Sequence, residues 1–182
     1  MRRALPVVLA VTVLLTALSA CGGGSGPTTS VPDKEADVEV MNEILARQMA
    51  AVDAYEAAMP QLRGVALAGA REFRAQEQEH VDATVKALRG LGGEADPPDE
   101  TIEAGELESG AEALRFLYEV ESATIDAELS AITKLTGSWP RALLASMVAN
   151  QAQRLVLIRR ALGTKPLHTI PGPFENGTTP AP

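Results

Sequence analysis

The sequence predicts an all-α fold, a four-helix bundle built from two similar helical hairpins that are joined by a long crossover. Apolar residues make up 46% of the 182 residues, but aromatic residues only 3%. The core is therefore expected to consist of Ala, Leu, Val and Ile, a composition that favours helices over sheets. Four segments place apolar residues at helical spacing, and Pro or Gly separates them. The length fits one domain.

The N-terminal residues are predicted to form an export and lipidation signal. Arg2 and Arg3 precede an apolar run over residues 4–17, and residues 18–21 read Leu-Ser-Ala-Cys. This order is typical of a secretory signal. The junction resembles the lipobox of bacterial lipoproteins, which implies cleavage directly before Cys21 and a lipid anchor that contains palmitate, with diacylglycerol on the Cys21 thiol. The alternative is an ordinary secretory signal with an incidental cysteine.

The predicted domain organisation follows from this signal. Residues 1–20 are the signal peptide, and residues 21–31 are the lipidated cysteine and a flexible tether rich in Gly, Ser and Thr. Residues 32–164 form the helical bundle. Residues 165–182 form a Pro-rich C-terminal tail. The protein is then expected to be exported and held at the cell membrane, facing away from the cytoplasm.

The first hairpin is predicted over residues 33–59 and 63–89, where apolar residues recur every three or four positions. Pro32 suits the start of the first helix, and Pro60 ends it. The second helix is expected to end at the glycines that begin with Gly90.

The second hairpin follows an acidic stretch that contains Pro97 and Pro98. This stretch is too long for a tight turn and is predicted to be a crossover between helices that run parallel. A third helix is expected over residues 110–135. Ser138 is the expected N-cap of the fourth helix, which stops at Gly163.

Each predicted helix carries polar residues in the middle of its apolar stripe. Burying a charged side chain costs several kcal/mol unless it is paired or ligates a metal, so this pattern needs a cause. Glu77 and His80 form a Glu-x-x-His motif, whose side chains share one helix face. The expected core polar cluster consists of Gln48, Glu77, His80, Glu121, Gln151 and Arg154.

The order of these residues along the chain resembles the ferritin-like family, in its secreted bacterial branches. In the di-metal bundles of that family, two helices give one Glu each and the other two give a Glu-x-x-His each. The resemblance extends over about residues 36–163. It implies that three residues match the expected ligand types, namely Glu77, His80 and Glu121. The other three positions differ: Gln48 and Gln151 each stand where a Glu is expected, and Arg154 stands where a His is expected.

Arg154 decides how this set is interpreted. A guanidinium has no acceptor and keeps its proton, so it cannot ligate a metal, and it repels a nearby cation. We therefore expect Arg154 to take the place of the metal and to bond Glu77 or Glu121. Two different arrangements stay open. One Fe, Mn or Zn ion is held by Glu77, His80 and Glu121 with water, or these side chains reach the surface and form no cluster.

The expected function is a membrane-anchored ferritin-like lipoprotein with a degenerate di-metal site. Such a protein would be a non-catalytic binding or structural module of the cell envelope, without a cofactor and with another envelope protein as candidate partner. The alternative is a metal-binding or redox protein that uses Glu77, His80 and Glu121. A pI near 4.8 argues against nucleic acid as a partner. No nucleophile–base motif or phosphate loop suggests an enzyme, and the sequence does not predict an oligomeric state.

The remaining polar residues are expected to be solvated. Asp53 and Asp126 lie beside the core stripe, where contact with the polar cluster is the alternative. The acids of residues 100–108 fit a solvated crossover. His168 lies in the tail, and the sequon at Asn176 carries little weight in a bacterial lipoprotein.

Overall fold

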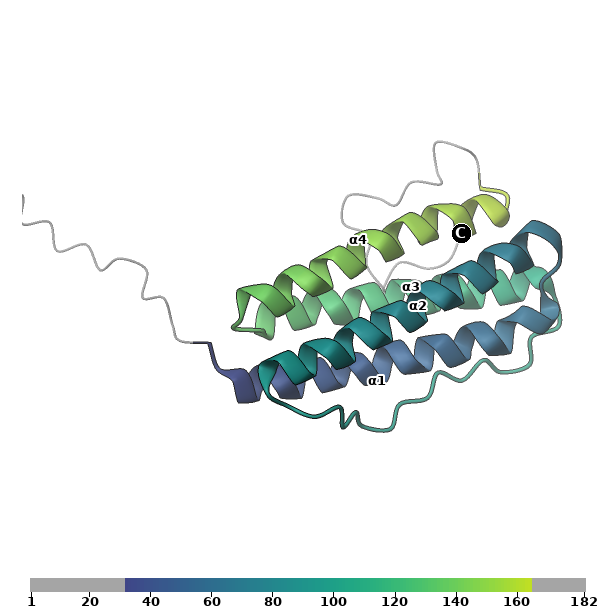
Figure 1. Cartoon of the computed structure of the whole chain (residues 1–182). Helices are drawn as coiled ribbons and strands as arrows, with labels where there is room; N and C mark the ends of the chain where they lie inside the picture. Colours follow the sequence, from purple (N-terminus) through teal and green to yellow (C-terminus); the bar gives the residue numbers. More distant parts are fainter. Residues whose placement is uncertain (1–31, 165–182) are drawn as a thin grey trace, which may run out of the picture.

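The computed structural model describes residues 32–164, which form four long helices packed side by side (Figure 1). No strand occurs among these residues, so the all-α prediction is confirmed. The predicted signal peptide, Cys21, the predicted tether and the predicted tail with His168 and Asn176 lie outside the described residues. The helices are α1 (Lys34–Ala58), α2 (Gly64–Leu91), α3 (Gly110–Lys134) and α4 (Ser138–Ala161), with a short 3-10 helix η1 (Met59–Gln61) between α1 and α2.

The helices pack in the order that two joined hairpins require. α1 packs against both α2 and α3, and α3 packs against α4, whereas the contact between α2 and α4 is much smaller than these three. The crossover between α2 and α3 runs along the whole length of the bundle beside α1 (Figure 1). This path returns the chain to the end where α2 began, so α2 and α3 run parallel, as predicted.

Local interactions explain where the two helices of the first hairpin begin and end. The carboxylate of Asp33 caps α1 by accepting a hydrogen bond from the backbone of Ala36 at 3.2 Å. Pro60 lies in η1, where the α-helix has already ended. α2 continues through Gly90 and ends at Leu91, two residues beyond its predicted end, because the residue that adopts the left-handed conformation is Gly92, with φ +89°.

The crossover is held against α1 at its start. A Cβ on Gly93 would lie 2.6 Å from both methyl carbons of Val38, so only a glycine permits this approach. The amide side chain of Asn42 then donates to the carbonyl of Glu94 at 3.2 Å and accepts from the backbone of Asp96 at 2.9 Å. One α1 side chain therefore positions the first turn of the crossover.

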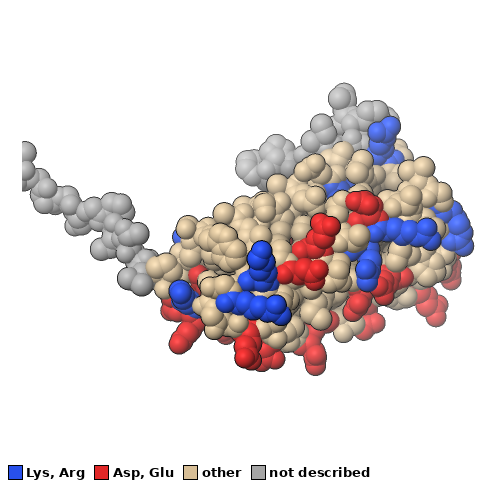
Figure 2. Space-filling view, in the orientation of Figure 1, with Lys and Arg blue, Asp and Glu red and all other residues tan. Residues whose placement is uncertain are grey.

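The rest of the crossover presents its acids to solvent. Figure 2 shows acidic side chains gathered along the lower edge of the molecule, where Figure 1 places α1 and the crossover. Arg47 of α1 pairs with Glu100 at 2.7 Å. The crossover acids of residues 100–108 are exposed, as expected: Glu100, Glu103, Glu106 and Glu108.

The second hairpin is tied to α1 by a buried carboxylate that was not among the residues singled out from the sequence. Asp37 is fully buried and accepts hydrogen bonds from the backbone of Thr136 at 2.6 Å and of Gly137 at 2.8 Å. The predicted N-cap at Ser138 is wrong by one residue, because Gly137 is the N-cap of α4. A side chain at Gly137 would meet Asp37 Oδ2 at 2.8 Å, so the carboxylate of α1 replaces a local capping side chain.

The apolar core consists of two main clusters, one toward each end of the bundle. The first surrounds Leu45, Leu88 and Leu144, and the second surrounds Leu117 and Ile158. The polar side chains described below lie between these clusters. No helix within residues 32–164 is long and apolar enough to cross a membrane.

Candidate functional site

A layer of buried polar side chains crosses the middle of the bundle, with contributions from all four helices. Five of the six residues predicted for the core polar cluster are at most 2% exposed, and the side chain of the sixth, His80, is 12% exposed. We call the whole set the polar layer: Gln48, Tyr55, Glu77, His80, Thr84, Glu121, Glu128, Gln151 and Arg154.

The arginine half of the polar layer is centred on Arg154 of α4. Its Nη2 lies 2.5 Å from Glu77 Oε1 and its Nη1 lies 2.9 Å from Glu121 Oε1. Nη2 of Arg154 also lies 3.5 Å from Nδ1 of His80. The same His80 Nδ1 lies 3.5 Å from Glu77 Oε1. The hydroxyl of Tyr55 donates to Glu121 Oε1 at 2.5 Å. These five side chains, from four helices, form the arginine half.

The amide half of the polar layer is centred on Glu128 of α3. Gln48 Nε2 donates to Glu128 Oε1 at 2.9 Å, and Gln48 Oε1 accepts from the hydroxyl of Thr84 at 2.7 Å. Gln151 Nε2 lies 3.4 Å from Glu128 Oε1 and 3.4 Å from Glu77 Oε1. Gln151 therefore connects the amide half, which also contains Gln48, Thr84 and Glu128, to the arginine half.

The two halves are related by the antiparallel packing of α1 and α3. On α1, Tyr55 follows Gln48 by two helical turns, and on α3, Glu128 follows Glu121 by two turns. The pairs form crosswise, since Gln48 contacts Glu128 and Tyr55 contacts Glu121. Gln48 of the first hairpin and Glu121 of the second therefore occupy equivalent positions in the polar layer, and so do Tyr55 and Glu128.

The charges of the three buried carboxyl groups follow from their partners. Burial raises the pKa of Glu121 to about 8 even though Arg154 opposes the shift. Burial likewise raises the pKa of Glu128 to about 8, against the hydrogen bond from Gln48. Burial also acts on Glu77, but the hydrogen bond with His80 and the charge of Arg154 outweigh it and hold its pKa below the ordinary value. At neutral pH, one ionised carboxylate therefore balances one guanidinium.

The hydrogen-bond donors agree with this distribution of protons. Burial, followed by the nearby Glu121 carboxyl, raises the pKa of Tyr55 well above its ordinary value, so the phenol stays a donor. Each of the three carboxyl groups uses Oε1 for its contacts, whereas Oε2 is buried without a hydrogen-bond partner among the described residues. A proton on Oε2 leaves the contacts of Glu121 and Glu128 in place.

A metal ion does not fit this arrangement. The guanidinium of Arg154 contacts the carboxylates of Glu77 and Glu121 and lies against the ring nitrogen of His80, which are the three ligands of the single-ion hypothesis. A cation within reach of these atoms would lie a few ångströms from a positive charge that cannot be released. Among the described residues, no group of three or more His, Cys, Asp or Glu side chains could hold a metal ion.

The burial of the acidic side chains separates those of the polar layer from those at the surface. Glu77 and Glu121 are buried, so they do not reach the surface at the edges of the bundle. Asp53 and Asp126 are exposed and contribute nothing to the polar layer.

Three residues of the polar layer, Tyr55, Thr84 and Glu128, were not among those predicted from the sequence. The positions of Tyr55 and Glu128 could have been found from the helical spacing. Tyr55 lies two turns after Gln48 and Glu128 lies two turns after Glu121, so each shares a helix face with a predicted residue. Thr84 belongs to the apolar stripe of α2, and nothing in the sequence marks its hydroxyl as a partner of Gln48.

Comparisons with known proteins agree with this architecture. A family model described as a ferritin-like domain matches residues 36–164. A search of curated proteins finds no match.

Three solved structures resemble the bundle. A conserved hypothetical protein of Mycobacterium tuberculosis aligns with a TM-score of 0.65 and 16% identity, over 71% of this chain and 99% of that one. A ferritin-like, diiron-carboxylate protein of Bacillus anthracis aligns with a TM-score of 0.58 and 20% identity, over 71% and 96%. A two-domain protein of Anabaena variabilis with DJ-1-like and ferritin-like domains aligns with a TM-score of 0.59 and 16% identity, over 73% and 39%. These likenesses show the shared fold.

Proposed function

Since the chain belongs to the ferritin-like family, we propose that it is a ferritin-like protein in which a buried arginine stands where relatives hold metal. We further propose that it is a lipid-anchored binding or structural module of the cell envelope without catalytic activity. The family's scaffold makes metal binding a natural starting hypothesis, and one relative of the same fold is a diiron-carboxylate protein. The chemistry of the polar layer argues for a different use of the scaffold.

The position of the Arg154 guanidinium carries this proposal. Its two terminal nitrogens lie 2.5 Å and 2.9 Å from Glu77 and Glu121, so its one positive charge supplies what a bound cation would otherwise supply. The remaining carboxyl, Glu128, pairs with neutral amides and is held protonated by burial. The guanidinium and the carboxyl groups therefore balance their charges without a metal, which lowers the cost of burying them.

Metal analysis of the protein, purified without an affinity tag, tests the first part of the proposal. After incubation with excess Fe²⁺, Mn²⁺ or Zn²⁺ and gel filtration, elemental analysis is expected to find well below one equivalent of each metal. Binding of about one equivalent that survives gel filtration would overturn the proposal, because structural and catalytic metals bind tightly.

A gain-of-binding variant serves as the matched control. Arg154→His together with Gln48→Glu and Gln151→Glu removes the guanidinium and restores the ligand types that the resemblance implies. This triple variant is expected to retain metal that the native chain does not retain. Metal bound equally by both proteins would show that Arg154 does not decide occupancy.

The lipid anchor is tested separately. Sequence alone supports it, through the apolar run and the junction before Cys21. In a bacterial host, the native protein is expected in the membrane fraction and to incorporate an alkyne-labelled palmitate. The Cys21→Ser variant is expected to lose the label and the membrane association. Label retained by this variant would contradict lipidation at Cys21.

A further inference from the structure

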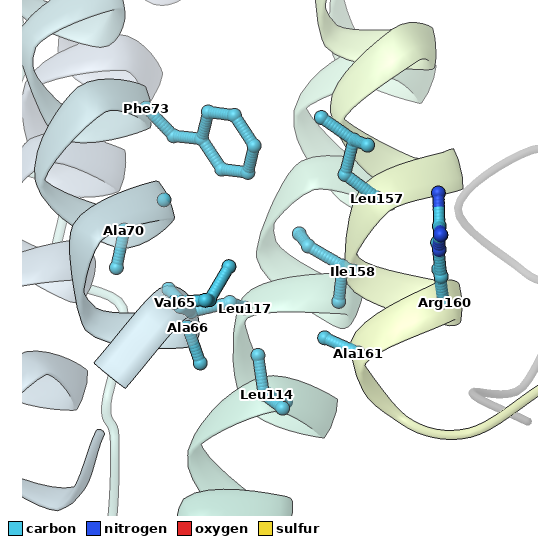
Figure 3. A pocket seen from close by; sticks show the side chains of 11 residues that line it. Val65, Ala66, Ala70, Phe73, Leu114, Leu117, Leu157, Ile158, Arg160 and Ala161 are labelled. Atoms are coloured by element: carbon cyan, nitrogen blue, oxygen red, sulfur yellow. The ribbon is translucent and has the colours of Figure 1, made fainter. Parts of the chain in front are cut away.

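An apolar cleft of about 520 Å³ opens between α2 and α4 at the end of the bundle where α4 finishes. Phe73 and Ala70 of α2 face Leu157 and Ile158 of α4 across it, and Leu117 of α3 forms part of its wall (Figure 3). The cleft lies beyond the polar layer and contains none of its residues. Phe73 marks the boundary between the two features, because its backbone carbonyl accepts from Arg154 Nη1 at 3.3 Å and its ring contacts Tyr55.

Small side chains keep the cleft open. The α2 segment that lines it includes Ala66, Gly69 and Ala70, which are too short to reach α4. Large apolar side chains are consequently left at the surface, with Val65 90% exposed and Leu157 50% exposed. An apolar surface of this kind in a stable protein indicates that another group covers it.

The last described residues of the chain lie beside this cleft. Ala161, the last residue of α4, lines the cleft. Gly163 then adopts φ +82°, its N–H donates to the carbonyl of Arg160 at 3.0 Å, and the N–H of Thr164 donates to the carbonyl of Arg159 at 3.1 Å. These two bonds define a Schellman turn, which ends the helix and turns the chain away from its axis. The described part of the chain therefore ends beside the mouth of the cleft.

The sequence that follows has the composition of an occupant. Residues 166–174 contain no Asp, Glu, Lys or Arg, and they include the three large apolar residues Leu167, Ile170 and Phe174. Three prolines in the same stretch restrict the unbound chain and so lower the entropy lost on docking. At about 3.1 Å per residue the nine residues reach roughly 28 Å, more than the roughly 12 Å of α2 that residues 65–73 span.

We propose that the C-terminal segment 166–174 docks into the cleft between α2 and α4 and covers Val65 and Leu157. The segment would then supply apolar contacts to both walls at a place where α2 and α4 touch each other little. This assignment adds an intramolecular partner to the fold and does not depend on the state of the polar layer.

A tryptophan placed in the segment reports its environment. The native Trp139 is 53% exposed and lies near Gly90, at the opposite end of α4, so it is replaced by Phe. Phe174→Trp is then introduced in a chain that begins at residue 22, which keeps the whole bundle and the segment. Its emission is expected to be blue-shifted and quenched several-fold less by acrylamide than that of a matched Pro180→Trp protein. Solvent-like emission from the Phe174→Trp protein would overturn the proposal.

A charge on the wall of the cleft tests where the segment docks. Leu157→Glu, added to the Phe174→Trp protein, is expected to return its emission to that of the Pro180→Trp protein. The matched control is Leu129→Glu on α3, which alters a side chain that is 43% exposed and does not line the cleft, and it is expected to change nothing. Equal effects of the two substitutions would contradict docking in this cleft.

Dye binding gives a second measurement that needs no tryptophan in the segment. A chain that stops after Thr164 is expected to bind 1-anilinonaphthalene-8-sulfonate with several-fold higher fluorescence than the chain to residue 182. Equal fluorescence would mean that the segment does not cover the cleft. A blue shift of the Phe174→Trp protein that disappears on dilution would instead assign the cleft to a second copy of the chain and overturn the intramolecular proposal.

Discussion

Glu77 of the arginine half and Glu128 of the amide half are both buried but differ in charge. In the arginine half, burial acts to raise the pKa of Glu77, but the hydrogen bond with His80 and the charge of Arg154 outweigh it and hold this pKa below its ordinary value. In the amide half, Glu128 has only amide donors, and burial raises its pKa to about 8. The comparison shows that burial alone does not determine the charge of a carboxyl group, because the partner decides whether the desolvated charge is compensated.

The pKa of Glu121 shows that one guanidinium keeps only one of its two neighbouring carboxyl groups ionised. Glu121 contacts Arg154 as Glu77 does, yet burial raises its pKa to about 8, and the negative charge of Glu77 contributes to this shift. One positive charge therefore keeps one carboxylate ionised, and the second carboxyl takes a proton and accepts from Tyr55 and Arg154. The charge of Arg154 and that of the ionised Glu77 therefore cancel at neutral pH, which lowers the cost of burying them.

The largest effect is expected from Arg154→Ala, which removes the centre of the arginine half. The substitution leaves the buried carboxyl groups Glu77 and Glu121 without their cation, and the free energy of unfolding is expected to fall by about 3–5 kcal/mol. Urea denaturation followed by circular dichroism measures the loss. Arg74→Ala is the matched control, because its pair with Glu56 at 2.6 Å is largely exposed and is worth less than about 1 kcal/mol. A loss of that size for Arg154→Ala would contradict its burial.

Making the arginine half neutral is expected to recover most of this loss. In the triple variant Arg154→Met, Glu77→Gln and Glu121→Gln, no buried charge needs a partner, and the amides still accept hydrogen bonds. Its unfolding free energy is expected to come within about 2 kcal/mol of the native value, since replacing a buried ion pair costs far less than breaking it. If the triple variant is no more stable than Arg154→Ala in the same urea experiment, lost packing explains the effect instead of lost charge.

The pH dependence of the unfolding free energy tests the protonation of Glu128 in the amide half. Glu121 and Glu128, with folded pKa values of about 8, bind protons more tightly than in the unfolded chain. This tighter proton binding stabilises the folded protein, and the contribution is fully present below the ordinary carboxyl pKa. It is lost as the pH rises toward and through 8, by up to about 1.4 kcal/mol of unfolding free energy per pH unit for each group. Glu128→Gln keeps the acceptor but cannot ionise. The variant is expected to match the native chain near pH 5 and to be more stable at pH 9.

Unfolding free energies at pH 5, 7 and 9 measure this difference. Glu77 contributes in the opposite direction, because its lowered pKa adds stability that is lost only as pH falls below the ordinary range. The two effects therefore occupy different pH windows. An unchanged pH dependence in Glu128→Gln would mean that Glu128 is ionised in the folded protein at neutral pH.

The smallest effect is expected from Thr84→Val. This change removes the hydroxyl that donates to Gln48 Oε1 at 2.7 Å and leaves a buried amide oxygen without its donor, at a cost of about 1 kcal/mol. Thr133→Val is the control, since its hydroxyl donates to the carbonyl of Ser130 at the surface, and its stability is expected to stay near the native value. Thermal unfolding compares the two variants. Equal stability of both would show that water satisfies Gln48.

Much of the fold was predictable from the sequence because its signals are local. Helical spacing of apolar residues located all four helices, and Pro60 and the glycines after Leu88 placed the breaks between them to within about two residues. The N-cap of α4 was misplaced by one residue, because the N–H of the N-cap Gly137 donates to the carboxylate of Asp37, which lies 100 residues earlier in the chain. A sequence pattern cannot reveal a cap that another helix supplies.

The sequence by itself determined which chemistry the polar layer can carry. An arginine in place of a histidine and two glutamines in place of glutamates exclude the usual ligand set, whatever the exact packing. Only the tertiary structure decided that Arg154 contacts both Glu77 and Glu121, that Gln48 faces Glu128, and that a cleft opens between α2 and α4. Donor and acceptor types belong to each residue, whereas contacts depend on the register and spacing of helices that are distant in the chain.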